Sequence, residues 1–241
     1  MIKTLPNRTC EGCPIRHRAV CATCDNDEFV QLEAMKYYRS YEAGQTIMWA
    51  GDRMEFVASV VDGTATIQHL VEDGRKQTVG LLLPSDFIGR PGRETALYDV
   101  TAITDVTLCC FRRREFEKLV ESTPHIAQRM LAMALDELDA ARDWMFLLGR
   151  KTARERIASF LLLVQRRTVA NDGLMLAQVA PIVLPLTREA MSDYLGLTLE
   201  TVSRQFSKLK ADGIIEYVSK REIIIPDLAA LRDVAGEGAT D

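Results

Sequence analysis

The sequence lacks the features that define several large classes of protein. It has no run of about 18 apolar residues, which a membrane-spanning helix needs, and no apolar segment typical of a signal peptide near its start. It also has no glycine-rich nucleotide fingerprint and no catalytic His/Asp constellation, and its three histidines form no local ligand pattern. We therefore expect a cytoplasmic protein with no membrane contact, and we do not expect an enzyme.

The charge is small in total but unevenly distributed. The 241 residues suffice for one or two domains, and their formal net charge of −4 does not by itself suggest a nucleic-acid partner. However, residues 1–149 carry 17 Lys and Arg against 22 Asp and Glu, whereas residues 150–226 carry 12 against 8. A basic carboxyl-terminal portion is compatible with DNA binding.

Six cysteines are many for a protein expected in a reducing compartment, and four of them lie within the first 24 residues. Cys10 and Cys13 form one C-x2-C pair, and Cys21 and Cys24 form a second. Two thiolates at this spacing can hold one metal ion or two irons of a cluster. The spacing leaves open a four-cysteine zinc site and a [4Fe–4S] cluster that uses three of these cysteines and a remote one. Inert buried thiols are the simplest alternative, which we favour for Cys110.

The pattern of apolar residues predicts an α+β protein. Asp25 and Glu28 form a capping box ahead of a short amphipathic helix. Between residues 40 and 111, short apolar stretches alternate with glycine turns and include an Asp73-Gly74 hairpin signal. This arrangement predicts an antiparallel, cupin-like β-roll.

After Pro124 the sequence predicts a long helix with an a/d repeat. The residues of this repeat are Ala127, Leu131, Ala134, Leu138, Ala141, Met145 and Leu148. A seam this narrow indicates a helix partner, most simply the same helix of a second copy in a parallel dimer. A core helix within one chain is the alternative, although it usually shows a broader apolar stripe.

Residues 187–211 predict a helix-turn-helix. Thr187 is the expected N-cap of a first helix, Gly196 supplies a tight turn, and Thr198 caps a second helix. One apolar stripe of the second helix is expected to be buried: Leu199, Val202, Phe206 and Leu209.

The polar face of this second helix suits the major groove of DNA, which such a helix enters with its N-terminus first. Arg204 can donate two hydrogen bonds to guanine, and Glu200 can accept one from cytosine. Ser203 can contact a base edge or a phosphate, and Thr198 is a further candidate contact. Basic residues nearby are expected to contact phosphates: Arg188, Lys208 and Lys210.

A hairpin, or wing, is predicted after the second helix. Residues 214–218 and 222–225 are two apolar stretches that flank Ser219, Lys220 and Arg221. We expect Lys220 and Arg221 at its tip to bind the DNA backbone.

These features together resemble the CRP/FNR superfamily of bacterial regulators. Residues 195–204 read LGLTLETVSR and closely resemble the recognition motif of that superfamily, including E-x-x-S-R. The cysteines make the chain most similar to the FNR branch of oxygen-sensing iron–sulfur regulators, in particular to its alphaproteobacterial, FnrL-type members. The resemblance covers essentially the whole chain.

The resemblance implies a [4Fe–4S] cluster held by three amino-terminal cysteines and one cysteine of the β-roll. Cys10 and Cys13 match the first pair of ligands, and Cys109 matches the ligand in the β-roll. Cys21 is the nearest match to the third ligand, although seven residues separate it from Cys13 and the enterobacterial spacing is C-x2-C-x5-C. Cys24 is the alternative third ligand.

The resemblance also implies a homodimer that binds a TTGA-like inverted repeat in double-stranded DNA while the cluster is intact. Such a dimer contacts RNA polymerase and controls anaerobic gene expression. We expect four parts in the chain: a cluster-binding loop and short helix (1–36), a sensory β-roll (37–122), a dimerisation helix (123–150) and a winged helix-turn-helix (151–241).

Three other functions compete with this one. Cyclic-nucleotide-binding members of the superfamily pair Gly-Glu with Arg-Ser, but the corresponding positions here read Gly89-Arg90 and Ala96-Leu97. The acidic ribose partner and the phosphate-clamping arginine are therefore missing from those positions. A regulator with structural zinc or another small-molecule effector is the second alternative. An electron carrier or redox enzyme is the third, and the helix-turn-helix argues against it.

Overall fold

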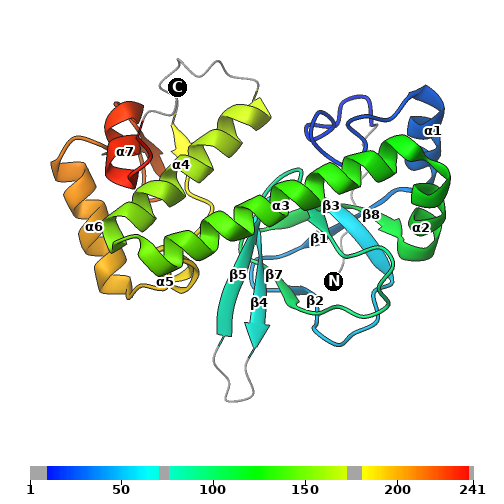
Figure 1. Ribbon diagram of the computed structural model, residues 1–241, viewed down its shortest axis with the longest axis horizontal. Coiled ribbons are helices and arrows are strands. Elements are labelled where there is room, and N and C mark those ends of the chain that lie inside the picture. Colours follow the sequence, from blue (N-terminus) through cyan, green and yellow to red (C-terminus); the bar gives the residue numbers. More distant parts are fainter. Residues whose placement is uncertain (1–9, 71–75, 173–180, 239–241) are drawn as a thin grey trace. The chain divides into compact units, whose positions relative to one another are not determined.

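The structure is a computed structural model that describes residues 10–70, 76–172 and 181–238 (Figure 1). The chain divides into two compact units, residues 1–139 and 140–241. The division falls within the long helix α3 (Pro124–Arg150). The predicted Asp73-Gly74 turn lies outside the described residues.

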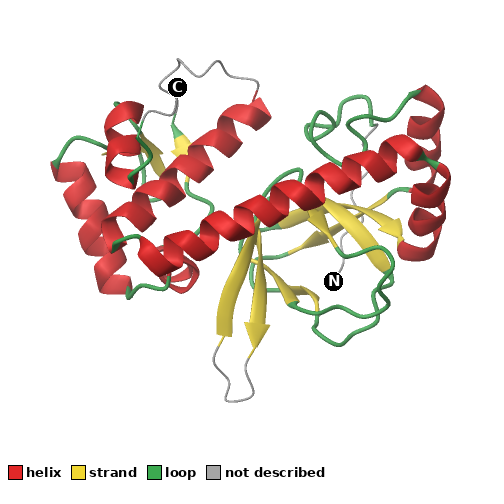
Figure 2. Cartoon of the chain, in the orientation of Figure 1, coloured by secondary structure: helices red, strands yellow, loops and turns green. Residues whose placement is uncertain are grey.

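The first unit contains the predicted antiparallel β-roll (Figure 2). Its strands are β1 (Tyr37–Tyr41), β2 (Thr46–Met48), β3 (Phe56–Asp62), β4 (Ala65–Leu70), β5 (Lys76–Leu82), β6 (Phe87–Ile88), β7 (Asp99–Ala102) and β8 (Val106–Arg112). They form two four-stranded sheets in the orders β1-β8-β3-β6 and β2-β7-β4-β5. Apolar side chains from both sheets, among them Ile88, Val100 and Leu108, pack into one core.

The two neighbouring cysteines of β8 belong to different cores, because successive side chains of a strand point to opposite faces of a sheet. Cys110 packs in the core shared by the two sheets. Cys109 packs in a second cluster with Leu32, Phe116 and Ile126. These three residues come from α1 (Asn26–Met35), α2 (Arg113–Ser122) and the first turn of α3. Cys109 therefore faces the helices of the first unit.

The predicted capping box begins α1. The Asp25 carboxylate accepts hydrogen bonds from the backbone N–H groups of Asp27 and Glu28 at 3.0 and 2.9 Å. In return, the Glu28 carboxylate accepts from the Asp25 backbone N–H at 2.9 Å. These three bonds satisfy backbone donors that have no partner within the helix, so the cap stabilises the start of α1.

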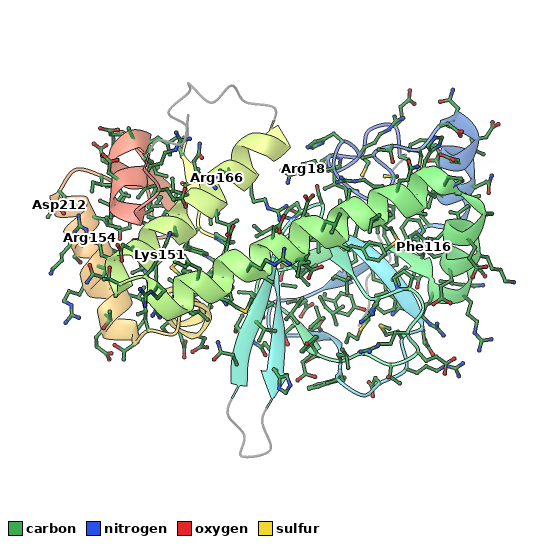
Figure 3. All side chains as sticks on the ribbon, viewed as in Figure 1. Arg18, Phe116, Lys151, Arg154, Arg166 and Asp212 are labelled. Atoms are coloured by element: carbon green, nitrogen blue, oxygen red, sulfur yellow. The ribbon has the colours of Figure 1, made fainter. Side chains whose placement is uncertain are left out.

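The second unit is the predicted winged helix-turn-helix. Its elements are α4 (Ala153–Asp172), β9 (Ile182–Val183), α5 (Arg188–Leu195), α6 (Leu199–Ala211), β10 (Glu216–Tyr217), β11 (Glu222–Ile224) and α7 (Leu228–Ala235). The wing hairpin, β10 and β11, gains β9 as a third strand that the sequence pattern did not predict, in the order β10-β11-β9. Arg154 of α4 pairs with Asp212 at the end of α6 at 2.5 Å (Figure 3). Within the described residues, no helix is long and apolar enough to cross a membrane.

Candidate cysteine centre and nucleic-acid interface

Residues 10–24 form a loop of turns, which we call the cysteine loop. Each C-x2-C pair closes a turn: the Cys13 N–H donates to the Cys10 carbonyl at 3.2 Å, and the Cys24 N–H donates to the Cys21 carbonyl at 3.3 Å. Ile15, Ala19 and Val20 are buried against the same cluster as Cys109. Burial of these apolar side chains holds a loop without regular structure against β8.

Four of the six cysteines line one cavity of the first unit. Cys10, Cys13 and Cys21 contribute from the cysteine loop, and Cys109 contributes from β8. Cys24 and Cys110 do not line this cavity. The structure thus brings together the four residues that the resemblance implies as ligands, and it places Cys21, rather than Cys24, beside the others.

The electrostatics of the thiols agree with this grouping. The pKa of Cys21 is raised to about 11, mainly by burial and also by the neighbouring thiols of Cys13 and Cys10. Burial also raises the pKa of Cys109, with further contributions from the thiols of Cys110, Cys10, Cys13 and Cys21. These thiols must release their protons to bind a metal or cluster, so binding there couples to proton release.

Cys24 has different surroundings. Burial raises its pKa to about 12, and its charged neighbours are Cys21, Glu28 and Asp25. Two of these neighbours belong to the capping box of α1, which makes the site unfavourable for additional negative charge. Cys24 therefore lies near Cys21 and the capping box of α1, outside the lining of the cavity.

The grouping of the cysteines bears on the choice between zinc and a cluster. In the described part of the chain, only Asp25, Glu28 and His125 bring three such ligand atoms within 4.8 Å of one another, and no three cysteines do so. Tetrahedral zinc with Zn–S bonds of about 2.3 Å needs sulfurs about 3.8 Å apart. A four-iron cluster spreads its cysteines more widely, because each sulfur binds a different iron. The described residues therefore contain no preformed three-cysteine zinc site, and the set of four cysteine donors suits a four-iron cluster.

The cysteine loop and α1 are tied to the first turns of α3. The Arg129 guanidinium donates to the Ala19 carbonyl at 3.3 Å and also to the Arg18 carbonyl. The Thr23 hydroxyl donates to the His125 carbonyl at 3.3 Å. The His125 ring Nδ1 lies 2.9 Å from a carboxylate oxygen of Glu28. Any displacement of the cysteine loop therefore disturbs the start of α3.

The turn of the helix-turn-helix has the predicted local chemistry. Thr187 caps α5 by accepting from the Ala190 N–H at 3.1 Å, and Thr198 caps α6 by accepting from the Thr201 N–H at 3.2 Å. Gly196 has a φ of +61°, a left-handed conformation that favours glycine. These three residues set the angle between the two helices.

The predicted buried stripe of α6 is correct except at its start. Val202, Phe206 and Leu209 are buried, but Leu199 is 44% exposed. A helical side chain lies over the turn that precedes it, and Leu199 is the first residue of α6, so it has no preceding turn to cover. The outer face carries four of the predicted DNA contacts in exposed positions: Glu200, Ser203, Arg204 and Lys208.

Arg204 and Glu200 are both available for contacts with DNA bases. Arg204 makes one long intramolecular hydrogen bond, to the Thr201 hydroxyl at 3.4 Å, so most of its donors face solvent. Hydrogen bonds from its own backbone N–H and from the Thr198 hydroxyl lower the pKa of Glu200. Glu200 is therefore ionised at neutral pH and can act as an acceptor.

Arg188 occupies a more enclosed position than the sequence suggested. Its guanidinium lies 3.2 Å from the centre of the Phe206 ring, and it donates to the Tyr217 hydroxyl at 2.8 Å. It thereby connects α5, α6 and the wing, and its contact with a phosphate stays a prediction. Lys220 is exposed in the turn of the wing, and the Lys210 ammonium lies 5.7 Å from the Tyr217 ring.

Sequence reasoning missed one residue that supports this interface. The Arg156 guanidinium donates to the carbonyls of Lys151, Leu195 and Leu148 at 3.0, 3.0 and 2.8 Å. It joins the end of α3 to the turn that precedes Gly196. An arginine in an amphipathic stretch gives no local sign of such a role.

Comparison with known proteins agrees with this architecture. Residues 155–234 match the Crp-like helix-turn-helix domain, and residues 38–123 match the cyclic nucleotide-binding domain. The chain is 61% identical to the transcriptional activator protein FnrL of Cereibacter sphaeroides, over 95% of this chain and 92% of that protein. The chain belongs to the CRP/FNR superfamily of transcriptional regulators.

Other members of the CRP/FNR superfamily are similar over most of their length. The nitrogen fixation regulation protein FixK of Bradyrhizobium diazoefficiens is 37% identical, over 87% of this chain and 86% of that protein. The structure of FixK2 from Bradyrhizobium japonicum matches with a TM-score of 0.74 and 34% identity, covering 86% of this chain and 98% of that chain. These relatives are regulators rather than enzymes.

The match to the cyclic nucleotide-binding domain identifies the fold of the β-roll in this superfamily member. At the first position of the missing nucleotide clamp, Gly89 has a φ of +96° and packs closely on Val57. An added Cβ there would meet the Val57 Cγ1 atom at 3.0 Å. The expectation that the chain binds no cyclic nucleotide stays a prediction, which rests on the residues at Gly89-Arg90 and Ala96-Leu97.

Proposed function

We propose that this regulator is an oxygen-responsive transcriptional activator that binds DNA as a homodimer while a [4Fe–4S] cluster is intact. The observation that carries the proposal is the cavity shared by Cys10, Cys13, Cys21 and Cys109. It lies in a chain that is 61% identical to a protein named as a transcriptional activator. Control of anaerobic genes is the function that these properties support best.

The cysteine loop and β8 would hold the cluster between them. Cys10, Cys13 and Cys21 would bind from the loop, and Cys109 would bind from the strand. When bound, the cluster supplies an oxygen-labile crosslink between these two segments. Because the loop is otherwise held by apolar contacts and turns, loss of the crosslink frees it to move relative to β8.

Movement of the cysteine loop would act on the dimer helix. The loop carries the Arg18 and Ala19 carbonyls that Arg129 binds, and Thr23, which binds the His125 carbonyl. The proposed dimer seam runs from Ala127 to Leu148, so Arg129 lies within its first turn. The state of the cysteine centre therefore reaches the seam through the first turns of α3.

The seam itself is supported by the exposure of its apolar residues. Leu131 is 62% exposed and Met145 is 65% exposed, and Leu138 is also exposed. Large apolar side chains repeated along one helix indicate a partner surface. The small residues Ala134 and Ala141 lie between them and permit close approach of a second helix. Leu148, the last seam residue, is half-buried.

A symmetric dimer would place two copies of α6 about 34–36 Å apart, one turn of DNA. Arg204 would then donate to a guanine and Glu200 would accept from a cytosine, which is compatible with the G·C pair of a TTGA-like half-site. Ser203, Thr198 and the lysines around them would contact the backbone or base edges. Activation also requires RNA polymerase as a partner.

Anaerobic purification tests the proposal. We expect a brown protein with iron and sulfide in the ratio of a [4Fe–4S] cluster, and air should bleach its visible absorbance. Binding to an operator duplex and dimerisation should be lost over the same time. Stoichiometric zinc together with operator binding that is insensitive to air would overturn the cluster and the oxygen response, and would leave a regulator with structural zinc.

A further inference from the structure

A buried lysine lies against the cysteine cavity. The Lys36 side chain is only 2% exposed, and its ammonium donates to the Cys10 sulfur at 2.9 Å and to a Glu33 carboxylate oxygen at 3.0 Å. The same Glu33 oxygen accepts the backbone N–H of Cys10 at 3.0 Å. A buried ammonium is costly unless it is paired, so its contacts with Cys10 and Glu33 stabilise the charge of Lys36.

This triangle of Lys36, Glu33 and Cys10 is built by the end of α1. Glu33 lies in the last turn of the helix, and Lys36 is its C-cap, whose backbone N–H donates to the Leu32 carbonyl at 3.0 Å. Leu32 and Tyr38 line the same cavity as the cysteines. In these apolar surroundings a charge acts more strongly than it would in water.

We infer that Lys36 is a positioning residue that makes a cluster bound at this site harder to oxidise. The inference rests on the proposed function, because it concerns a cluster held by Cys10. Charge and hydrogen bonds at the sulfurs set the reduction potential of iron–sulfur clusters. Lys36 supplies both, one positive charge and an N–H···S hydrogen bond to Cys10, whereas Glu33 supplies a negative charge that partly offsets it.

The step that Lys36 opposes is the transfer of one electron from the cluster to dioxygen. With a cluster bound, dioxygen would gain the electron and become superoxide, the cluster would gain one positive charge, and no proton would move. The ammonium beside Cys10 repels this added positive charge. The carboxylate of Glu33 favours the same added charge, so the two side chains have opposite effects.

Two single variants test this opposition. Lys36→Met removes the charge and keeps a long unbranched side chain. We expect it to lower the midpoint potential of the couple between the one-electron-oxidised and the intact cluster. We also expect faster loss of cluster absorbance in air, on the order of tenfold. Glu33→Gln keeps an amide oxygen that can accept the Cys10 N–H but removes the negative charge. We expect a raised potential and slower loss.

Two further variants serve as controls. Lys36→Arg keeps the positive charge, and we expect it to restore a potential close to that of the native protein. Lys118→Met removes the same charge from an exposed position on α2 and should change neither the potential nor the rate. A merely structural role of Lys36 would alter cluster occupancy without moving the potential in opposite directions in the Lys36 and Glu33 variants.

The outcomes separate this inference from the function on which it rests. A native chain that assembles no cluster under anaerobic conditions overturns the proposed function. A native chain with a cluster, and a loaded Lys36→Met protein with the native potential and rate, overturns the inference alone. Should Lys36→Met fail to load a cluster, Glu33→Gln decides: a raised potential supports the role of local charge, and an unchanged one refutes it.

Discussion

Arg129 is the residue whose replacement should most directly separate oxygen sensing from DNA binding. Its guanidinium makes two hydrogen bonds to the cysteine loop, to the carbonyls of Arg18 and Ala19. Arg129→Met keeps much of the side-chain volume and removes both bonds. We expect the variant to assemble its cluster normally, because Arg129 is not among the residues that line the cysteine cavity.

The size of the effect follows from the two bonds. A hydrogen bond to a charged group contributes about 1.5–3 kcal/mol when buried. Arg129 is only half-buried, so we take about 2 kcal/mol for the pair, which corresponds to about a thirtyfold change in an equilibrium constant. About thirtyfold is therefore the largest change that loss of this contact can cause in the equilibrium that couples the cysteine loop to α3.

The assay compares operator affinity with and without air. Fluorescence anisotropy on an operator duplex gives the ratio of the two dissociation constants, and visible absorbance reports the cluster in the same sample. We expect Arg129→Met to reduce this ratio by up to about thirtyfold, while an exposed neighbour, Gln128→Met, leaves it unchanged. An Arg129→Met protein with a full cluster and the native ratio would refute the role of this contact.

Four further predictions concern the ligands, the dimer and the DNA. Cys24→Ser should keep the full iron and sulfide content after anaerobic purification, whereas Cys21→Ser should lose it, because of these two cysteines only Cys21 lines the cavity. The reverse result would make Cys24 the third ligand. Leu138→Glu places charge in the exposed seam and should yield a monomer with an intact cluster in anaerobic sedimentation; a stable dimer would place the interface elsewhere. Arg204→Ala should reduce discrimination of the operator guanine by about 1–3 kcal/mol in competition assays with a substituted base, and retained discrimination would contradict base reading by Arg204. By contrast, Lys220→Ala should weaken binding to all sequences alike and reduce the salt dependence by about one phosphate contact.

Local elements of this fold could be predicted because their stabilising contacts are local. The capping box of Asp25 and Glu28 and the N-caps of Thr187 and Thr198 each involve residues three positions apart. The turn at Gly196 depends on its own backbone conformation. Such contacts are encoded in short stretches of sequence. The burial of Leu199 was predicted wrongly because its spacing matched the stripe, whereas its position at the helix start left it uncovered.

The cysteine centre shows where the local pattern stops being sufficient. Two C-x2-C pairs cannot by themselves select Cys21 over Cys24, because both lie in the same short loop. The cavity includes Cys21 and leaves out Cys24, and β8 directs Cys109 and Cys110 to opposite sides of its sheet. A pattern of residue types contains no information on which sulfurs face one cavity until strand and loop are packed together.

By itself, then, the sequence determined the class of regulator, the α+β architecture, the helix-turn-helix with its capped turn, and the exposed face of α6. Only the tertiary structure placed Cys21 rather than Cys24 in the cavity with the other three cysteines, and it revealed Lys36 beside Cys10 and Arg129 bonded to the cysteine loop. The bonds of Arg129 join residues 110 and 111 positions apart. Such contacts have no local periodicity or spacing, because they exist only after burial of apolar surface has brought the cysteine loop, β8 and α3 together.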